Sequence, residues 1–375
     1  MAHSYTPGLK VLGETLVEKA RILPLKGKVL KEIGATCEPD DICCSTNLPG
    51  NVQMVNIANR LNVEAIEIPE LMKKSEGDAV SKGDIIAESL GIFGFFKSQI
   101  HSPADGTIEA ISSVTGQVVL REAPIPVEVD AYISGRIKEV IPEEGVIIET
   151  EAAMIQGIFG IGGESRGELV MLATNRDEEL DPDFIKPEHK GKVIVGGSFV
   201  SIEAFRKAQS VGVKGIVVGG FDYNKLKDLL GYTLGVAITG TENLGVTMVV
   251  TEGFGKMHMA KRTFELLQQH EGDFASISGA TQIRAGVIRP EIVIPLNKDM
   301  LRGNTKIKEV GSMEKGSLVR IIRAPYFGKI GTVQSLPPEL TKMESETMVR
   351  VAIIRLSDDS DVLVPRANLE MVETD

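Results

Sequence analysis

The sequence has no tryptophan, and aromatic residues make up only 5% of its 375 residues. Proteins that hold single-stranded nucleic acid stack bases on aromatic rings, so this shortage argues against a nucleic-acid channel along the chain. Positive charge is also in deficit, because the formal net charge is −11 at pH 7. A phosphate backbone would be repelled by the molecule as a whole. The composition therefore excludes a nucleic-acid coat protein but leaves room for a local basic patch.

Long apolar runs are missing as well. No stretch of the sequence approaches the roughly 18 apolar residues that a membrane-spanning helix needs. Residues 1–10 are polar, without the apolar run of a secretory signal peptide. We therefore expect no membrane partner and a cytoplasmic location.

Cysteine is scarce, with only Cys37, Cys43 and Cys44 present. Their spacing includes an adjacent pair and lacks the paired C-x-x-C pattern of structural zinc sites. Reduced cysteines on a strand commonly pack as small apolar side chains. We expect no bound metal and no cofactor.

The zinc-protease motif H-E-x-x-H is also lacking from the sequence. His258 and Glu252 follow a predicted strand and could serve as an acid and a base. A histidine in the second turn of an amphipathic helix is, however, more often a partly exposed surface residue. The sequence leaves enzymatic activity undecided and favours a protein without it.

Glycines at fixed offsets are the first positive signal. Gly106 and Gly116 lie ten positions apart, as do Gly135 and Gly145, and apolar residues occupy matching positions between them. A glycine permits positive φ at a tight turn, so each copy predicts two strands joined by a bend. Residues 1–160 are therefore predicted to form a β-rich region.

The middle of the chain alternates between short apolar runs and amphipathic segments. Residues 192–195, 215–218 and 247–250 are apolar runs typical of buried strands, and residues 200–211, 223–230 and 256–270 have helical periodicity. Such alternation predicts an α/β domain with a mostly parallel sheet, which we place at residues 161–296. Glycines follow all three strands, at the sheet edge where helix amides favour anions. The predicted ligand-binding residues are Gly196, Gly197, Ser198, Gly219, Gly220, Gly253, Gly255 and Lys256. The alternative is that these glycines only permit tight turns, since no full Rossmann or P-loop motif is present.

The C-terminal part returns to strands. Residues 297–312 are polar and are predicted to form a linker, and residues 313–375 contain alternating runs such as 348–355 and 362–365. Residues 315–375 are almost neutral, with eight basic and nine acidic residues. Arg320, Arg323, Tyr326, Phe327 and Lys329 mix cations with aromatic rings near one turn, a combination suited to RNA or to a protein partner. The alternative is that the rings close the fold and the charges are solvated.

Three resemblances follow from these motifs. Residues 315–333, with Gly328 and Gly331 ahead of Val333, resemble the KOW motif of NusG/Spt5-type elongation factors, which implies an SH3-like β-barrel. Residues 76–88 and 102–108 resemble a biotinyl/lipoyl-type barrel-sandwich hybrid, although the position of the modified lysine falls near Phe95 and Lys97 is two places away. Residues 190–217 resemble swivelling or protease-associated β/α domains. The expected fold class is α+β multidomain, with a barrel-sandwich hybrid, a central α/β domain and an SH3-like barrel.

Two functions fit these features. The first is a non-catalytic adaptor or scaffold that docks a large transcription- or translation-related assembly, with the ribosome or RNA polymerase as the partner and RNA as a further partner of the C-terminal barrel. The second is an accessory subunit of a metabolic enzyme that binds an anionic small molecule at the glycine loops. Exposure of Tyr326 and Phe327 would favour the first.

Overall fold

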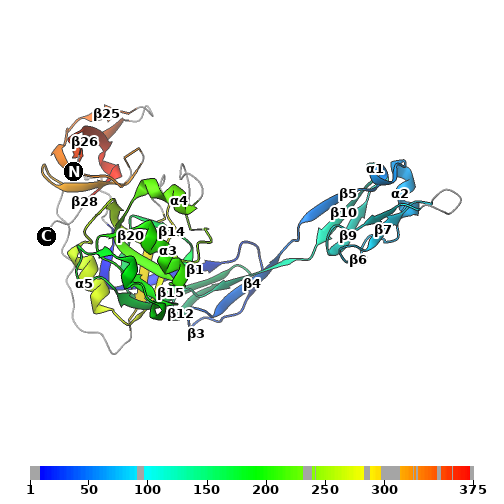
Figure 1. Ribbon diagram of the computed structural model, residues 1–375, viewed down its shortest axis with the longest axis horizontal. Coiled ribbons are helices and arrows are strands. Elements are labelled where there is room, and N and C mark those ends of the chain that lie inside the picture. The colour runs from blue at the N-terminus through cyan, green and yellow to red at the C-terminus, as the bar shows by residue number, and fades with distance from the viewer. Residues whose placement is uncertain are drawn as a thin grey trace.

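The computed structural model describes residues 9–90, 97–230, 239–240, 242–282, 288–296, 313–323, 325–326, 328–343, 348–356 and 358–371. Strands dominate and are distributed over several sheets, which confirms the prediction of a β-rich multidomain protein. A large body and a small distal module lie at opposite ends of an elongated molecule (Figure 1). Within these residues no helix is both long and apolar enough to cross a membrane.

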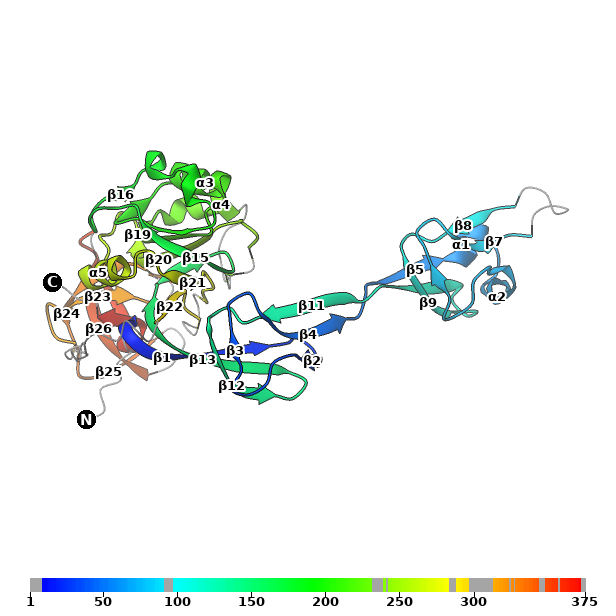
Figure 2. The same cartoon turned by 90° about the horizontal axis from the view of Figure 1, so that it is seen from below.

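The part of the body nearest the distal module is built mainly from N-terminal strands (Figure 2). β1 and β12 both pair antiparallel with β13, and β3 continues the sheet beyond β12. Cys37, Cys43 and Cys44 are all free and buried in its core, as the sequence predicted for apolar packing. The strands are β1 (Val11–Ile22), β2 (Lys28–Val29), β3 (Thr36–Cys37), β12 (Gly135–Ile141) and β13 (Gly145–Gln156).

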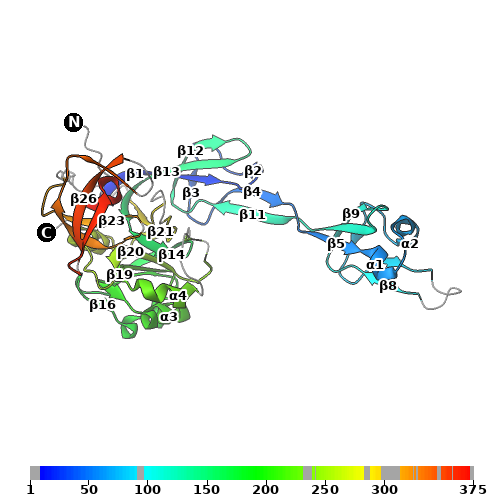
Figure 3. The ribbon, with the colours of Figure 1, turned by 90° about the horizontal axis from the view of Figure 1, so that it is seen from above.

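An arm of two strands leads out of this part. β4 (Ile42–Leu48) and β11 (Ile125–Asp130) pair antiparallel, and the chain passes along β4 into the distal module and returns along β11. Figures 2 and 3 show the two strands reaching from the body toward the module. We use "arm" for β4 and β11, and "distal module" for residues 52–122.

The distal module has its own core. Its main sheet has the order β5-β10-β9-β6, and a second pair, β7 and β8, lies beside it. Ile57, Ile68, Ile108 and Val118 are fully buried between these elements. The elements are β5 (Val52–Asn56), α1 (Ile57–Leu61), α2 (Ile68–Leu71), β6 (Ala79–Val80), β7 (Ile85–Glu88), β8 (Gln99–His101), β9 (Gly106–Ile111) and β10 (Gln117–Glu122).

The two predicted glycine repeats both form hairpins, which confirms that prediction. β9 pairs with β10 and β12 pairs with β13. Gly116 directly precedes β10, with a φ of 67°, and Gly145 is the first residue of β13, with a φ of 158°. The left-handed φ of Gly116 is the conformation that favours glycine.

The central region has a parallel sheet flanked by antiparallel strands. β15, β17, β19 and β20 are parallel, as predicted, whereas β14 and β21 pair antiparallel at either side. Helices contribute to two apolar cores of this region. Residues of α3 and α4 belong to one core, and residues of α5 belong to the other. The elements are β14 (Phe159–Ile161), β15 (Glu164–Met171), β16 (Glu179–Leu180), β17 (Val193–Val195), β18 (Phe199–Val200), α3 (Ile202–Val211), β19 (Gly215–Phe221), α4 (Leu226–Leu230), β20 (Thr247–Phe254), α5 (Lys261–Gln269), β21 (Phe274–Ser278) and β22 (Glu291–Pro295).

Hydrogen bonding continues across the boundary predicted at residue 160. β22 pairs with β21 on one side and with β13 on the other, so the central sheet runs into the N-terminal strands as one 13-stranded sheet. The last predicted helix also begins later than expected, at Lys261 instead of residue 256. Met257 and Met259 donate their amides to Ser198 and Arg176 instead of to a helical turn.

The C-terminal segment forms a separate six-stranded sheet around its own core. We refer to this segment as the C-terminal barrel, after the fold that the sequence leads us to expect. Its order is β25-β26-β24-β23-β28, with β27 paired to β26. The strands are β23 (Leu318–Ile321), β24 (Ile330–Ser335), β25 (Leu340–Lys342), β26 (Met348–Leu356), β27 (Asp361–Pro365) and β28 (Leu369–Met371). The predicted linker, residues 297–312, lies outside the described residues.

Candidate functional site

The predicted glycine loops do meet at one edge of the central sheet. Gly219 in β19 donates its amide to the carbonyl of Gly197 at 2.8 Å, and Met257 donates to Ser198 at 3.2 Å. Gly220 lies opposite Gly253 in the ladder between β19 and β20. The inference that parallel strands gather these loops was therefore correct.

The backbone amides of these loops are already engaged in hydrogen bonds within the protein. The amides of Gly196, Gly197, Ser198 and Gly255 all donate to backbone carbonyls at 2.9–3.1 Å. A Cβ atom on Gly219 would lie 2.2 Å from the carbonyl oxygen of Met257. Real Cβ atoms do not approach so closely, so this glycine permits two chain segments to pack together. The geometry fits the close-packing alternative better than an anion cradle.

The remaining polar groups of this edge are paired near the surface. The ammonium group of Lys256 forms an ion pair with Glu179 and lies 5.8 Å from the ring centre of Phe199. His258 is exposed and its Nδ1 lies 2.7 Å from a carboxylate oxygen of Asp177. His258 therefore pairs with Asp177 and does not form an acid–base pair with Glu252.

The C-terminal barrel contacts this same edge. The carbonyl oxygen of Gly328 lies 3.1 Å from where a Cβ of Gly253 would be, and a Cβ on Gly328 would lie 2.4 Å from the ring of Phe254. Ile322 of the barrel is 4% exposed and belongs to the apolar core of the central region. Two sites that the sequence predicted separately thus lie against each other.

A buried ion cluster joins the barrel to the central sheet. Arg320 in β23 lies 3.0 Å from Glu252 in β20 and 3.4 Å from Glu370 in β28, and Arg289 lies 3.8 Å from Glu370. Burial raises the pKa of Glu370, while Arg320 and Arg289 oppose that rise. Arg320, predicted to bind a partner together with the other cations near one turn, instead points its side chain into the contact between the two parts.

The other predicted partner-binding residues lie elsewhere on the barrel. Tyr326 is half-buried against the barrel core, and the ammonium group of Lys329 lies 5.9 Å from its ring centre and 4.0 Å from Asp358. Arg323 is exposed, and Phe327 lies outside the described residues. Tyr326 therefore offers a partner only part of its ring.

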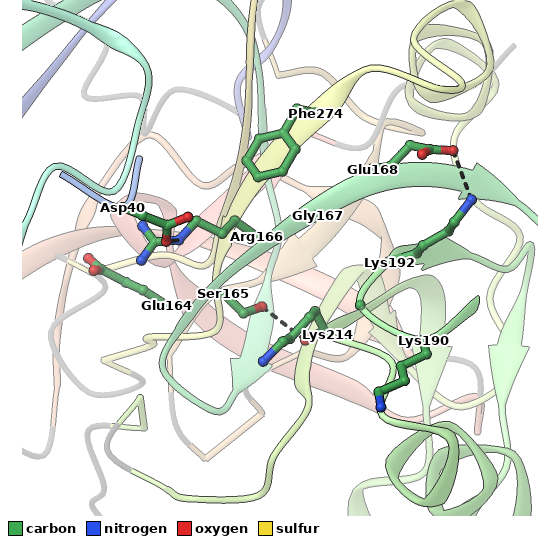
Figure 4. Close-up of a pocket in the computed structure, with 11 residues that line it drawn as sticks. Asp40, Glu164, Ser165, Arg166, Gly167, Glu168, Lys190, Lys192, Lys214 and Phe274 are labelled. Atoms are coloured by element: carbon green, nitrogen blue, oxygen red, sulfur yellow. Dashed lines mark hydrogen bonds and ion pairs between the residues drawn. The ribbon is translucent and has the colours of Figure 1, made fainter. Parts of the chain in front are cut away.

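Arg166, which the sequence did not single out, holds the base of both arm strands. Its guanidinium donates to the carbonyl of Pro39 at 2.6 Å and lies 2.8 Å from Asp40, just before β4. It also pairs with Asp130, the last residue of β11, which Arg21 contacts at 3.0 Å. Figure 4 shows Arg166 beside Asp40 and Glu164. No motif predicts this contact, since its members come from distant parts of the chain.

Tyr132 supports the same junction from inside the core. It is fully buried, has a φ of 67° and accepts a hydrogen bond from Ser276 at its backbone carbonyl. The guanidinium of Arg21 lies 5.4 Å from its ring centre. A left-handed conformation is costly for a residue with a large side chain, so the surrounding contacts must hold it in place.

The distal module places Lys97 at its β7–β8 pair. Lys97 lies 2.8 Å from Glu88, and Gln99 donates to the same carboxylate at 3.0 Å. These contacts lower the pKa of Glu88 to about 2, chiefly through Lys97. The ammonium group is held by this carboxylate, and Phe95, nearest the position expected for a modified lysine, lies outside the described residues.

Comparison with known proteins gives no family by which to interpret these contacts. The sequence matches no family model, and no curated protein matches it significantly.

Proposed function

We propose that the protein is a non-catalytic adaptor that docks a large transcription- or translation-related assembly, with the distal module as its main docking element. The arm is the observation that carries this proposal. β4 and β11 carry a module with its own core away from the body, and Arg166 ties the base of both strands to the central sheet. A separate module on an anchored arm suits a protein that bridges two partners, because the module can reach one while the body contacts another.

The surface of the distal module supports this role. Met54, Ile66 and Val114 have 69%, 72% and 87% of their surface exposed. The turn that carries Val114 lies close to Ile66, since a Cβ on Gly116 would be 3.4 Å from the Cβ of Ala65. Exposed apolar side chains such as those of Ile66 and Val114, on segments that lie close together, suit a protein contact surface.

The C-terminal barrel has a secondary part in this proposal. Its edge around Gly328 and Arg320 is engaged with the central sheet. Contacts with RNA or protein would then involve the exposed residues Arg323 and Lys329. The resemblance to the KOW motif supports an assembly of the ribosome or RNA polymerase type, but only as an analogy of fold.

The test is binding to purified ribosomes and to purified RNA polymerase from the source organism, by co-sedimentation and by pull-down. We expect the wild-type protein to bind one of them. A double variant, Ile66→Asp with Val114→Asp, should lose this binding, because it places two charges on the proposed docking surface. The matched control is Leu16→Asp with Leu25→Asp, which adds the same charge at exposed positions of the body. The proposal would be contradicted if the wild-type protein bound neither assembly, or if the two double variants lost binding to the same extent.

A further inference from the structure

A cavity of about 640 Å³ opens at the opposite end of the central parallel strands from the glycine loops. It lies between β15, the chain segments that lead into β17 and β19, and Asp40 at the base of the arm (Figure 4). Its volume falls within the roughly 300–1,000 Å³ typical of sites for small molecules. The arm, the central sheet and the cavity therefore share one junction.

The sheet register gathers charged residues at this cavity. Leu169, Val193 and Gly215 are neighbours across β15, β17 and β19. The residue before each of them is therefore also a neighbour, which places Glu168, Lys192 and Lys214 side by side. The backbone confirms this proximity, because the amide of Lys214 donates to the carbonyl of Lys192 at 2.8 Å. Lysines on neighbouring strands repel each other unless a negative charge lies between them.

Protein carboxylates neutralise only some of these cations. Lys192 lies 2.9 Å from Glu168, and Arg166 is paired with Asp40 and Asp130. In the part of the chain that the structure describes, Lys190 and Lys214 have no ion-pair partner although both line the cavity. Both lysines are exposed, so an anion that enters the cavity can reach two positive charges that no protein carboxylate neutralises.

The walls of the cavity restrict the kind of anion. Asp40, Glu164 and Glu168 lie on the same rim as the lysines, so a long polyanion such as RNA would meet negative charge on either side. A compact anion can contact the lysines and avoid the carboxylates. The ring of Phe274, 46% exposed, supplies an apolar wall for the organic part of a ligand.

We propose that this cavity binds a small organic phosphate, with its phosphate between Lys190 and Lys214 and its organic part toward Phe274. The proposal is independent of the docking function, since it concerns a different surface. It places the ligand at the base of the arm, where Arg166 lines the cavity and also holds Pro39 and Asp130.

Isothermal titration calorimetry of the full chain tests this proposal, with adenosine monophosphate and pyrophosphate as probes. We expect saturable binding of one equivalent of either probe. Lys190→Ala and Lys214→Ala should each weaken binding about ten-fold, since each removes a charge-assisted contact. Phe274→Ala should weaken binding of adenosine monophosphate and leave that of pyrophosphate unchanged.

Lys207→Ala is the matched control, because Lys207 is an exposed lysine of α3 in the same region. It should bind both probes as the wild type does. Equal weakening by Lys207→Ala would indicate general attraction to a surface, and absence of saturable binding at millimolar concentration would overturn the proposal. Tighter binding of a short single-stranded RNA than of either probe would also overturn it, by assigning the lysines to nucleic acid. Melting temperatures equal to that of the wild type would confirm that the variants are folded.

Discussion

The guanidinium of Arg320 and the carboxylate of Glu252 lie 3.0 Å apart, although 68 residues separate them in the sequence. Arg320 is 3% exposed and Glu252 is 7% exposed. Each comes from a different sheet, so the pair fixes the C-terminal barrel to the edge of the central region. Charged groups in such a position must be paired, because an uncompensated buried charge is costly.

Removal of Arg320 should therefore destabilise the protein strongly. We expect Arg320→Met to lower the free energy of unfolding by about 3–5 kcal/mol, because Glu252 and Glu370 would lose a buried partner. Urea denaturation followed by circular dichroism measures this change. Arg355→Met is the matched control, since Arg355 forms an exposed pair with Asp361 on the same barrel. It should cause little measurable change, and equal effects of the two substitutions would contradict a special role for Arg320.

Gly328 makes the closest approach between the barrel and the central region. Its φ of 79° is left-handed, and an added Cβ would lie 2.4 Å from the ring of Phe254. We expect Gly328→Ala to cost about 1–2 kcal/mol for the backbone conformation and about 1–3 kcal/mol more for the clash. Gly316→Ala isolates the first contribution, because Gly316 has a φ of 90° in the same barrel with no atom within 4 Å. Equal decreases in melting temperature for the two variants would contradict the expected clash, because they would mean that the ring of Phe254 moves aside without cost.

Arg166 should control how firmly the arm is held. Its loss removes the contacts with Pro39 and Asp40 and leaves Asp130 with Arg21 alone. We expect Arg166→Ala to speed hydrogen exchange of the β4 and β11 amides about 5- to 30-fold, equivalent to about 1–2 kcal/mol of local stability. Arg136→Ala is the control, since Arg136 forms an exposed pair with Glu149 on the neighbouring β12 and β13. Unchanged exchange in Arg166→Ala would show that the junction is held by other contacts.

Glu88 should make the distal module sensitive to acid. Because its pKa in the folded protein is about 2, below the ordinary 4.5, its ion pair stabilises the fold above pH 4.5. That stabilisation is lost as the pH falls from 4.5 toward 2. In Lys97→Met the pKa of Glu88 should rise toward its ordinary value, which a carboxyl-carbon NMR titration measures. Lys82→Met is the control, since Lys82 is an exposed lysine of the same module, and it should leave the titration of Glu88 unchanged. An unchanged titration in Lys97→Met would show that Lys97 does not influence Glu88.

Much of the local structure could be predicted because it depends on neighbouring residues. Hairpins at the paired glycines and the helix of residues 202–211 follow from turn chemistry and apolar spacing. The pairing of β13 with β22 could not be predicted in the same way. Its two strands are more than a hundred residues apart, and no local pattern records which distant edge a strand joins.

The candidate sites show the same division between local pattern and long-range packing. Glycines at strand ends look alike in sequence whether they bind a phosphate or allow Gly219 to approach the carbonyl of Met257. Arg320, in an alternating strand, has the pattern of a solvated charge, and only the distant Glu252 explains its burial. No local pattern marks Lys192 and Lys214 as parts of one site, because only the strand register makes them neighbours.

The course of the chain through the arm also has a mechanical meaning. The chain leaves the body along β4 and returns along β11, so a pull on the distal module would place both strands under tension along their backbones. The hydrogen bonds between them would carry little of that load, because both strands are drawn in the same direction. Force would instead reach the body at Asp40 and Asp130, where one arginine of the central sheet grips both strands. A partner that moves relative to the body would thus strain this junction first, beside the wall of the cavity.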